Sequence, residues 1–218
     1  MIDPLPAPER PSSVFAMIVG SVRAWRRRRG AGLAALAVAL AAVAATPPAA
    51  AIEVGGFRFD DTVRIGGADL RLNGVGLRSV FILKAFLAAL YVPQRTADPA
   101  ELIRQSGPRR LQLRMLVDMS PDRLLKTFTA GLHDSPAEPH DAALKAQIDE
   151  LDAALKAVGT VRKGETLDLD VVDGQMRLLV NGQMRAAVPG DGVFAAILRG
   201  WIGERPLEKD LKNGLLGG

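Results

Sequence analysis

The sequence predicts an α+β fold, in which an antiparallel sheet carries helices on one face. This fold class follows from the order of the expected elements along the chain. Segments with the two-residue alternation of strands come first, then helices, then a three-strand meander and two closing helices. Asp173-Gly174 and Asn181-Gly182 are typical of type I′ hairpins, which make the meander antiparallel. Because no repeat and no Pro/Gly/Ser-rich linker follows Ala51, we expect a single domain over residues 52–218.

The first strands are predicted between Phe57 and Val92. Apolar residues at alternating positions indicate extended structure from Phe57 onward, with Gly66-Gly67 as a turn. The nearly continuous apolar run Val80–Val92 favours one long central strand, although periodicity alone also permits a helix. Gly74-Val75-Gly76 lacks the third glycine of a nucleotide-binding loop and is interpreted as a tight turn.

The later elements follow from start and stop signals. Ser120-Pro121-Asp122 supplies a cap, a first-turn proline and an acid near the helix dipole, and so predicts a helix start. Gly159 is expected to end the next helix. The other expected elements are a short helix over 99–105, a strand over 111–117, a helix after Pro139, strands from Leu167 to Val188, and helices over 193–201 and 207–216.

Residues 1–51 are predicted to be an export leader. Four arginines, Arg26–Arg29, precede an apolar run over 30–45, and small residues close the segment at Ala51, the expected cleavage position. The apolar run is short and rich in alanine, so an uncleaved anchor is the second interpretation. Met17 is an alternative initiator, and the arginines also permit twin-arginine export. We therefore expect a periplasmic or secreted domain.

The leader carries the whole net charge. It contains six arginines and two acids, and since the totals are 28 and 24, residues 52–218 keep 22 basic and 22 acidic side chains. A neutral domain gives no electrostatic reason to expect nucleic acid, or a membrane beyond the leader, as a partner. Cysteine is absent, which excludes disulfides, thiolate catalysis and cysteine-based metal sites.

No cofactor and no metal is predicted. The two histidines, His133 and His140, lie in a stretch that also holds Asp134 and Glu138. Such residues can bind a metal when they converge, but this stretch is rich in proline and acids, and we interpret it as a solvated loop.

Arg78 and Tyr91 are the candidate ligand-binding residues. Arg78 follows the glycine segment and stays charged, so it needs an anionic partner if it points inward. Tyr91, the sole tyrosine, lies thirteen residues further on. A guanidinium and a phenol together can hold a carboxylate, a phenolate or an enolate. A surface salt bridge for Arg78 and a core-edge position for Tyr91 are the alternatives.

The segment Leu72–Arg78, followed by Lys84–Tyr91, resembles the chalcone isomerase superfamily. Plant enzymes of that superfamily carry a Gly-Ala-Gly-x-Arg segment before a Phe-Ile-Lys-Phe-Thr-Ala-Ile-Gly-Val-Tyr strand. The stretch Phe194–Leu216 is similar to the bacterial chalcone isomerase-like branch. The resemblance spans nearly all of the chain after the leader. It implies an open-faced β-sandwich, a large antiparallel sheet under a layer of helices.

The resemblance implies two functions. In an isomerase Arg78 would be catalytic, but the other catalytic positions fall on or near Phe86, Arg123, Ala130 and Gly200, which do not offer the same groups. Non-catalytic members resemble fatty-acid-binding proteins, in which an arginine and a tyrosine hold the carboxylate. We expect an exported, non-catalytic binder of a small hydrophobic anion such as a fatty acid, with Arg78 and Tyr91 on its carboxylate. An intramolecular lyase of the chalcone–flavanone isomerase type and an envelope protein-interaction module are the alternatives.

Overall fold

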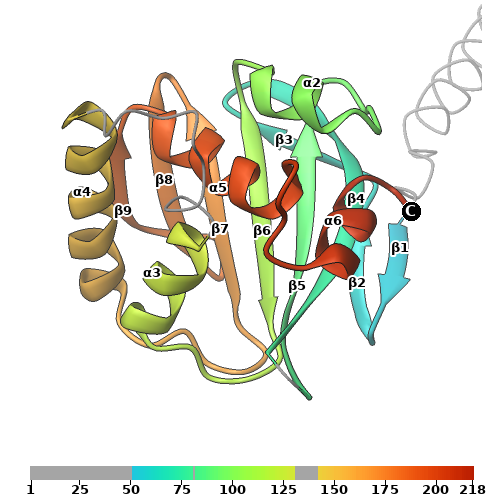
Figure 1. The fold of residues 1–218 in the computed structure, drawn as a ribbon, viewed down its shortest axis with the longest axis horizontal. Coiled ribbons are helices and arrows are strands. Elements are labelled where there is room, and N and C mark those ends of the chain that lie inside the picture. The colour runs from blue at the N-terminus through green and yellow to red at the C-terminus, as the bar shows by residue number, and fades with distance from the viewer. Residues whose placement is uncertain (1–50, 81, 131–141) are drawn as a thin grey trace, which may run out of the picture. The chain divides into compact units, whose positions relative to one another are not determined.

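The computed structural model describes residues 51–80, 82–130 and 142–218, and its main element is a seven-stranded sheet (Figure 1). The strands lie in chain order, β3 to β9, and every neighbouring pair is antiparallel. Their bounds are Thr62–Ile65, Ala68–Val80, Leu83–Val92, Arg109–Met115, Thr166–Val172, Gln175–Val180 and Gln183–Pro189. A two-stranded hairpin, β1 (Ala51–Val54) and β2 (Phe57–Asp60), precedes the sheet.

Five helices of the described part of the chain cover one face of the sheet (Figure 1). They are α2 (Pro99–Arg104), α3 (Pro121–Thr129), α4 (Ala142–Val158), α5 (Gly192–Ile202) and α6 (Lys209–Leu215). All five contribute buried side chains to one core with the strands beneath them. None of these helices is long and apolar enough to cross a membrane. The predicted α+β, open-faced arrangement is confirmed.

Several local signals act as the sequence predicts. Pro121 opens α3 with Ser120 at the N-cap position, although the Ser120 side chain makes no capping hydrogen bond to the helix. At α2, for which no cap was predicted, the carboxylate of Asp98 accepts a hydrogen bond from the amide of Ala100 at 2.9 Å. In the meander Asp173 and Asn181 have φ of 52° and 51°, the positive values that a type I′ hairpin requires. These turns set the register of β7 with β8 and the start of the register of β8 with β9, which shifts between Leu178 and Leu179.

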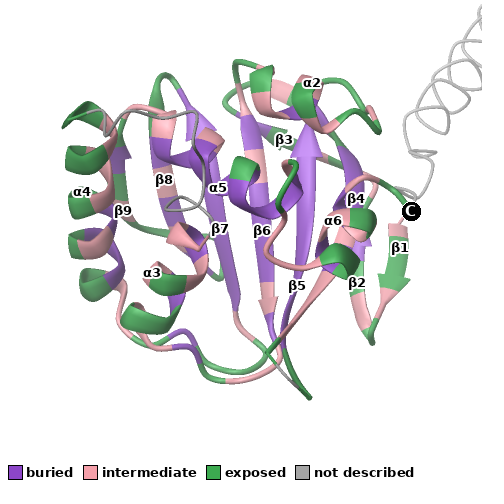
Figure 2. Cartoon of the chain, in the orientation of Figure 1, coloured by how far each residue is buried: buried purple, intermediate pink, exposed green. Residues whose placement is uncertain are grey.

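The alternation of strand residues divides the interior into two cores (Figure 2). In β5, Phe86 and Leu90 face the helices, whereas Leu87 and Tyr91 face the opposite side. There the β1–β2 hairpin contributes buried Phe59 to the second core. Because both faces of β5 are covered, every residue from 85 to 92 is buried, which explains why this strand is apolar throughout.

The prediction of one strand over Val80–Val92 is wrong at its start. The chain reverses direction between Val80 and Leu83, which pair with each other. Tight turns ordinarily carry Gly, Asn, Asp or Pro. This turn contains none of them, so the sequence gives no sign of it.

The prediction of a glycine turn at 74–76 is also wrong, because these residues lie inside β4. Helix α6 crosses them so closely that a side chain would not fit: a Cβ at Gly74 would meet the carbonyl of Gly214, and one at Gly76 that of Leu211. The glycines therefore serve a close approach between helix and strand. This contact holds the start of α6 beside the end of β4.

Candidate ligand site

Arg78 lies near the end of β4, on the face of the sheet that the helices cover. Its cross-strand partner is Phe86, and directly opposed residues of an antiparallel pair point to the same face. Phe86 is fully buried in the core beneath the helices. Arg78 thus stands at the rim of that core, with 16% of its side-chain surface exposed.

A carboxylate already occupies the guanidinium of Arg78. Nη1 donates a hydrogen bond to Oε2 of Glu208 at 2.8 Å, and the backbone amide of Ser79 donates to the same oxygen at 2.9 Å. Glu208 holds the N-cap position of α6, where its side chain makes no capping hydrogen bond to the helix, and it is 20% exposed. Nη1 also donates to the carbonyl of Ser79. Nε of Arg78 is buried and has no hydrogen-bond partner among the described residues, so the guanidinium uses only part of its capacity.

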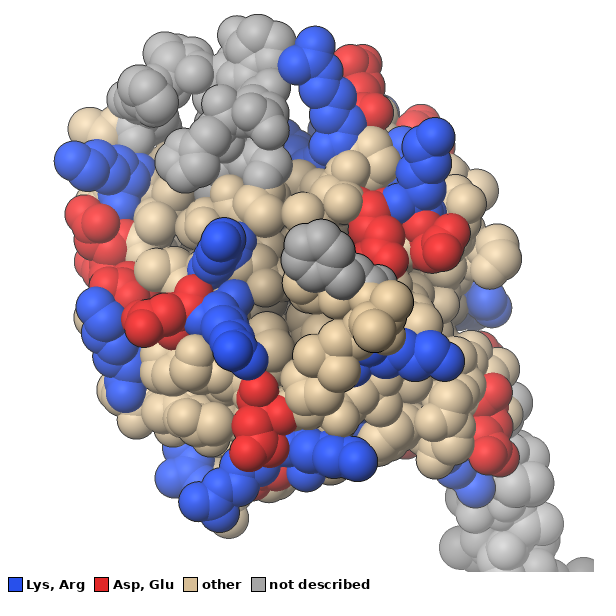
Figure 3. Space-filling view, turned by 60° about the horizontal axis from the view of Figure 1, so that its bottom comes forward, with Lys and Arg blue, Asp and Glu red and all other residues tan. Residues whose placement is uncertain are grey.

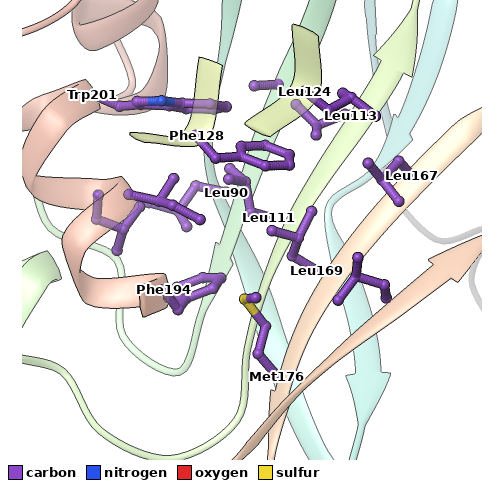
Figure 4. Close-up of a cluster of buried hydrophobic side chains, with 14 of the residues drawn as sticks. Leu90, Leu111, Leu113, Leu124, Phe128, Leu167, Leu169, Met176, Phe194 and Trp201 are labelled. Atoms are coloured by element: carbon purple, nitrogen blue, oxygen red, sulfur yellow. The ribbon is translucent and has the colours of Figure 1, made fainter. Parts of the chain in front are cut away.

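Aromatic side chains fill the core next to this ion pair. The ring centroids of Phe86 and Trp201 are 5.8 Å apart, and those of Phe128 and Trp201 are 6.0 Å apart. Figure 4 shows Trp201 above Phe128 at the helix side of the sheet. The indole Nε1 of Trp201 donates to the carbonyl of Thr127 at 3.2 Å, which ties α5 to α3. The apolar core therefore begins at Phe86, the cross-strand neighbour of the arginine that binds the carboxylate.

The structure does not bring Tyr91 to Arg78. Tyr91 pairs with Leu72 and belongs to the core on the opposite face of the sheet. Burial raises the pKa of its hydroxyl to about 12, with a further contribution from the carboxylate of Asp60, while Arg110 acts in the opposite sense. The predicted arrangement, with both side chains on one carboxylate, does not agree with this geometry.

Around Tyr91 the structure instead places a ladder of polar pairs between β6 and β7. Arg110 binds Asp170 through two hydrogen bonds of 2.6 Å each, and Nε2 of Gln112 donates to Asp168 at 2.8 Å. Arg114 donates to the hydroxyl of Thr166 one step further along. These partners are directly opposed in the register of the two strands.

Burial raises the pKa of the Asp168 carboxyl, although Arg110 and Gln112 favour its charged form. The pKa of Arg110 is also raised, because its contacts with Asp170 and Asp168 outweigh the cost of burial. A cavity of about 330 Å³ opens on the ladder, lined by Gln112, Arg114, Thr166, Asp168, Asn181 and Gly182. Its polar lining does not suit an aliphatic chain, and neither Arg78 nor Tyr91 lines it.

Sequence reasoning missed Glu208 and the polar ladder. No local pattern identifies Glu208, which lies 130 residues from Arg78 along the chain. The ladder had a signal: basic and amide side chains alternate with leucines over 110–114, and Asp168 and Asp170 alternate with leucines in the next strand. Pairing these two strands would have predicted the opposed charges.

The positions that the resemblance assigns to other catalytic groups are apolar, small or solvent-facing. Phe86 is packed under Trp201, Gly200 is buried within α5, and Arg123 is exposed on α3. Among residues 51–80, 82–130 and 142–218 no three side chains are arranged to hold a metal ion. The stretch with His133, Asp134, Glu138 and His140 lies outside the described residues.

Comparison with known proteins agrees with this architecture. The model of the chalcone isomerase-like family matches residues 51–217. The chain belongs to the chalcone isomerase-like family. Among solved structures, this family member is similar to the crystal structure of a fatty-acid binding protein from Arabidopsis thaliana, with a TM-score of 0.59 and 15% sequence identity over 77% of this chain and 96% of that chain. No curated protein matches the sequence.

Proposed function

We propose that this chalcone isomerase-like protein binds a small hydrophobic carboxylate, such as a fatty acid, and that Arg78 holds the acid group. One observation carries the proposal: Nη1 of Arg78 and the amide of Ser79 already bind a carboxylate, that of Glu208, at the rim of an apolar core. The similar Arabidopsis fold, whose title names a fatty-acid binding protein, supports this ligand class. The leader pattern supports a periplasmic or secreted location for this binding.

The acid would replace Glu208 on Arg78. A free carboxylate has two oxygens and can approach the guanidinium edge that carries Nε, which has no partner among the described residues. Two parallel hydrogen bonds from one guanidinium are stronger and more directional than the single one to Glu208. The amide of Ser79 would remain as a further donor.

The aliphatic tail would enter the apolar layer that begins at Phe86 and Trp201. Both side chains are fully buried, so the tail needs an outward shift of α3 or α5. The hydrophobic gain grows by about 0.8 kcal/mol for each buried methylene, which favours long acids over short ones. Tyr91 has no place in this proposal because it lies on the opposite face of the sheet.

The proposed role is binding without catalysis. Opening or closing a chalcone ring needs groups that polarise a carbonyl and position a phenolate. Phe86 and Gly200, which occupy two of the corresponding positions, carry no polar side-chain atom. These residues favour a binding protein over an intramolecular lyase.

The test is ligand titration of the purified protein with dodecanoate and hexadecanoate, followed by native mass spectrometry and thermal unfolding. We expect a one-to-one complex, tighter for hexadecanoate, and at least a tenfold weaker complex in Arg78→Ala. Arg71→Ala, which removes an exposed arginine of the same strand, is the matched control and should bind as the wild type does. Absence of binding to either acid, or equal binding in Arg78→Ala, would overturn the proposal.

A further inference from the structure

Exposed apolar side chains gather at the tip of the β4–β5 hairpin. Val80 is 43% exposed, Leu83 is 51% exposed, and Ile82, in the turn between them, is fully exposed. In the described residues only two other large hydrophobic side chains are comparably exposed, Ile52 and Met184, and they are remote in sequence. Monomeric proteins keep consecutive apolar residues off their surface unless they have a use there.

The tip projects beyond the sheet. The last pair between β5 and β6 is Phe86 with Met115, while the hairpin continues for two more pairs, Ser79 with Lys84 and Val80 with Leu83. On the other side, β3 pairs with β4 only up to Arg71. No strand therefore flanks the end of the hairpin, which forms the lowest point of the molecule in Figure 1.

The shape of the tip favours a bilayer as its partner. It is narrow and convex, and a protein would need a matching cavity to bury it, whereas a lipid interface accommodates it anywhere. At about 3.3 Å per strand residue, the turn and the last pair extend roughly 7 Å, similar to the depth at which peripheral proteins bury apolar side chains in the headgroup region. Lys84, exposed beside the apolar tip, is placed to bind lipid phosphates.

We propose that Val80, Ile82 and Leu83 insert into the interfacial region of a phospholipid bilayer and dock the domain there. On the face shown in Figure 3, which turns this end of the molecule toward the reader, basic and acidic side chains are interspersed. Apolar insertion rather than a basic patch therefore drives the docking, and zwitterionic lipid suffices. The inference does not depend on fatty-acid binding, and it revises the expectation that no membrane beyond the leader is a partner.

Because the chain has no cysteine, one introduced cysteine can carry an environment-sensitive fluorophore. Ile82→Cys places it at the tip, and Met184→Cys, at an exposed apolar position on the far edge strand β9, is the matched control. Both are made in the full chain, so the leader contributes equally to both. With phosphatidylcholine vesicles that contain a nitroxide-labelled lipid, we expect a blue shift and quenching at position 82 and neither at 184.

A second readout uses the unlabelled protein. We expect Ile82→Ser with Leu83→Ser to lower vesicle co-sedimentation at least threefold, and Met184→Ser to leave it unchanged. An equal response at positions 82 and 184, or no response at 82, would refute the proposal. A blue shift at 82 that appears without vesicles and grows with protein concentration would refute it in favour of docking to a second copy.

Discussion

Arg78 and Arg110 are equally buried, each with 16% of the side chain exposed, yet they bind carboxylates in different ways on opposite faces of the sheet. Arg110 holds Asp170 with Nε and Nη2 at 2.6 Å each and has Asp168 at 3.9 Å from Nη1. Arg78 holds Glu208 with one nitrogen, and its Nε has no partner among the described residues.

The difference separates a structural arginine from one available to a ligand. A guanidinium that already binds one carboxylate through both Nε and Nη2 has little capacity left for a ligand, and removing it leaves two buried carboxylates of the neighbouring strand β7 without their cation. A guanidinium held through a single nitrogen can exchange its partner for one that also engages Nε. In the proposed function, the helix-covered face therefore binds the ligand, whereas the polar ladder of the opposite face stabilises the sheet.

The largest effect is expected for Arg110→Ala. It leaves Asp168 and Asp170, both at least 96% buried, without their cation, and should lower the free energy of unfolding by about 3–5 kcal/mol. Arg78→Ala leaves only a partly exposed glutamate and should cost about 1 kcal/mol. Urea unfolding followed by tryptophan fluorescence measures both. Equal losses in the two variants would contradict the distinction between the arginines.

The next effect concerns Tyr91, on the same face as Arg110. Its pKa is about 12 in the folded protein against about 10 when unfolded, so between these pH values the unfolded chain loses a proton that the folded protein keeps. Stability should therefore fall as pH rises from 10 to 12, by up to about 2.7 kcal/mol, and less in Tyr91→Phe.

Because Tyr91 is the sole tyrosine, its ionisation can be followed directly by absorbance near 295 nm. We expect a midpoint near pH 12 for the folded protein and near 10 in urea. A folded-state midpoint near 10 would show that the hydroxyl is accessible to water and would contradict the burial of Tyr91.

A smaller effect on stability is expected for Gly76→Ala, which changes only the helix-covered face that holds Arg78. The added Cβ would meet the carbonyl of Leu211, so α6 must move and take Glu208 away from Arg78. We expect a loss of about 2 kcal/mol in unfolding free energy. Gly67→Ala is the control: nothing lies within 4 Å of its Cβ, and its φ of 81° gives a backbone cost of about 1 kcal/mol without moving α6. Equal losses, with α6 unmoved, would contradict the close approach.

The sequence predicted the parts of the fold that rest on local chemistry. Asp173-Gly174 and Asn181-Gly182 set the meander, and Pro121 set the start of α3. It failed where tertiary contact decides the conformation. In the sequence Gly74 and Gly76 suggest a turn, but they are glycines because α6 crosses β4 there too closely for a side chain. The turn after Val80 contains no residue typical of turns.

The candidate site was predicted only in part for the same reason. Residue types singled out Arg78, but whether Tyr91 shares its face depends on where the chain turns. Arg78 pairs with Phe86, and Tyr91 lies five residues, an odd number, beyond Phe86. Strand side chains alternate, so an odd separation puts the two on opposite faces. The turn that fixes this parity had no signal in the sequence.

The most direct test of the account is the affinity of Glu208→Gln for dodecanoate, measured by titration calorimetry. If Glu208 competes with the ligand for Arg78, neutralising it should tighten binding by about tenfold, or about 1.4 kcal/mol, and a second change, Arg78→Ala, should abolish the gain. Unchanged or weaker binding in Glu208→Gln would contradict the claim that Arg78 exchanges an internal carboxylate for a ligand.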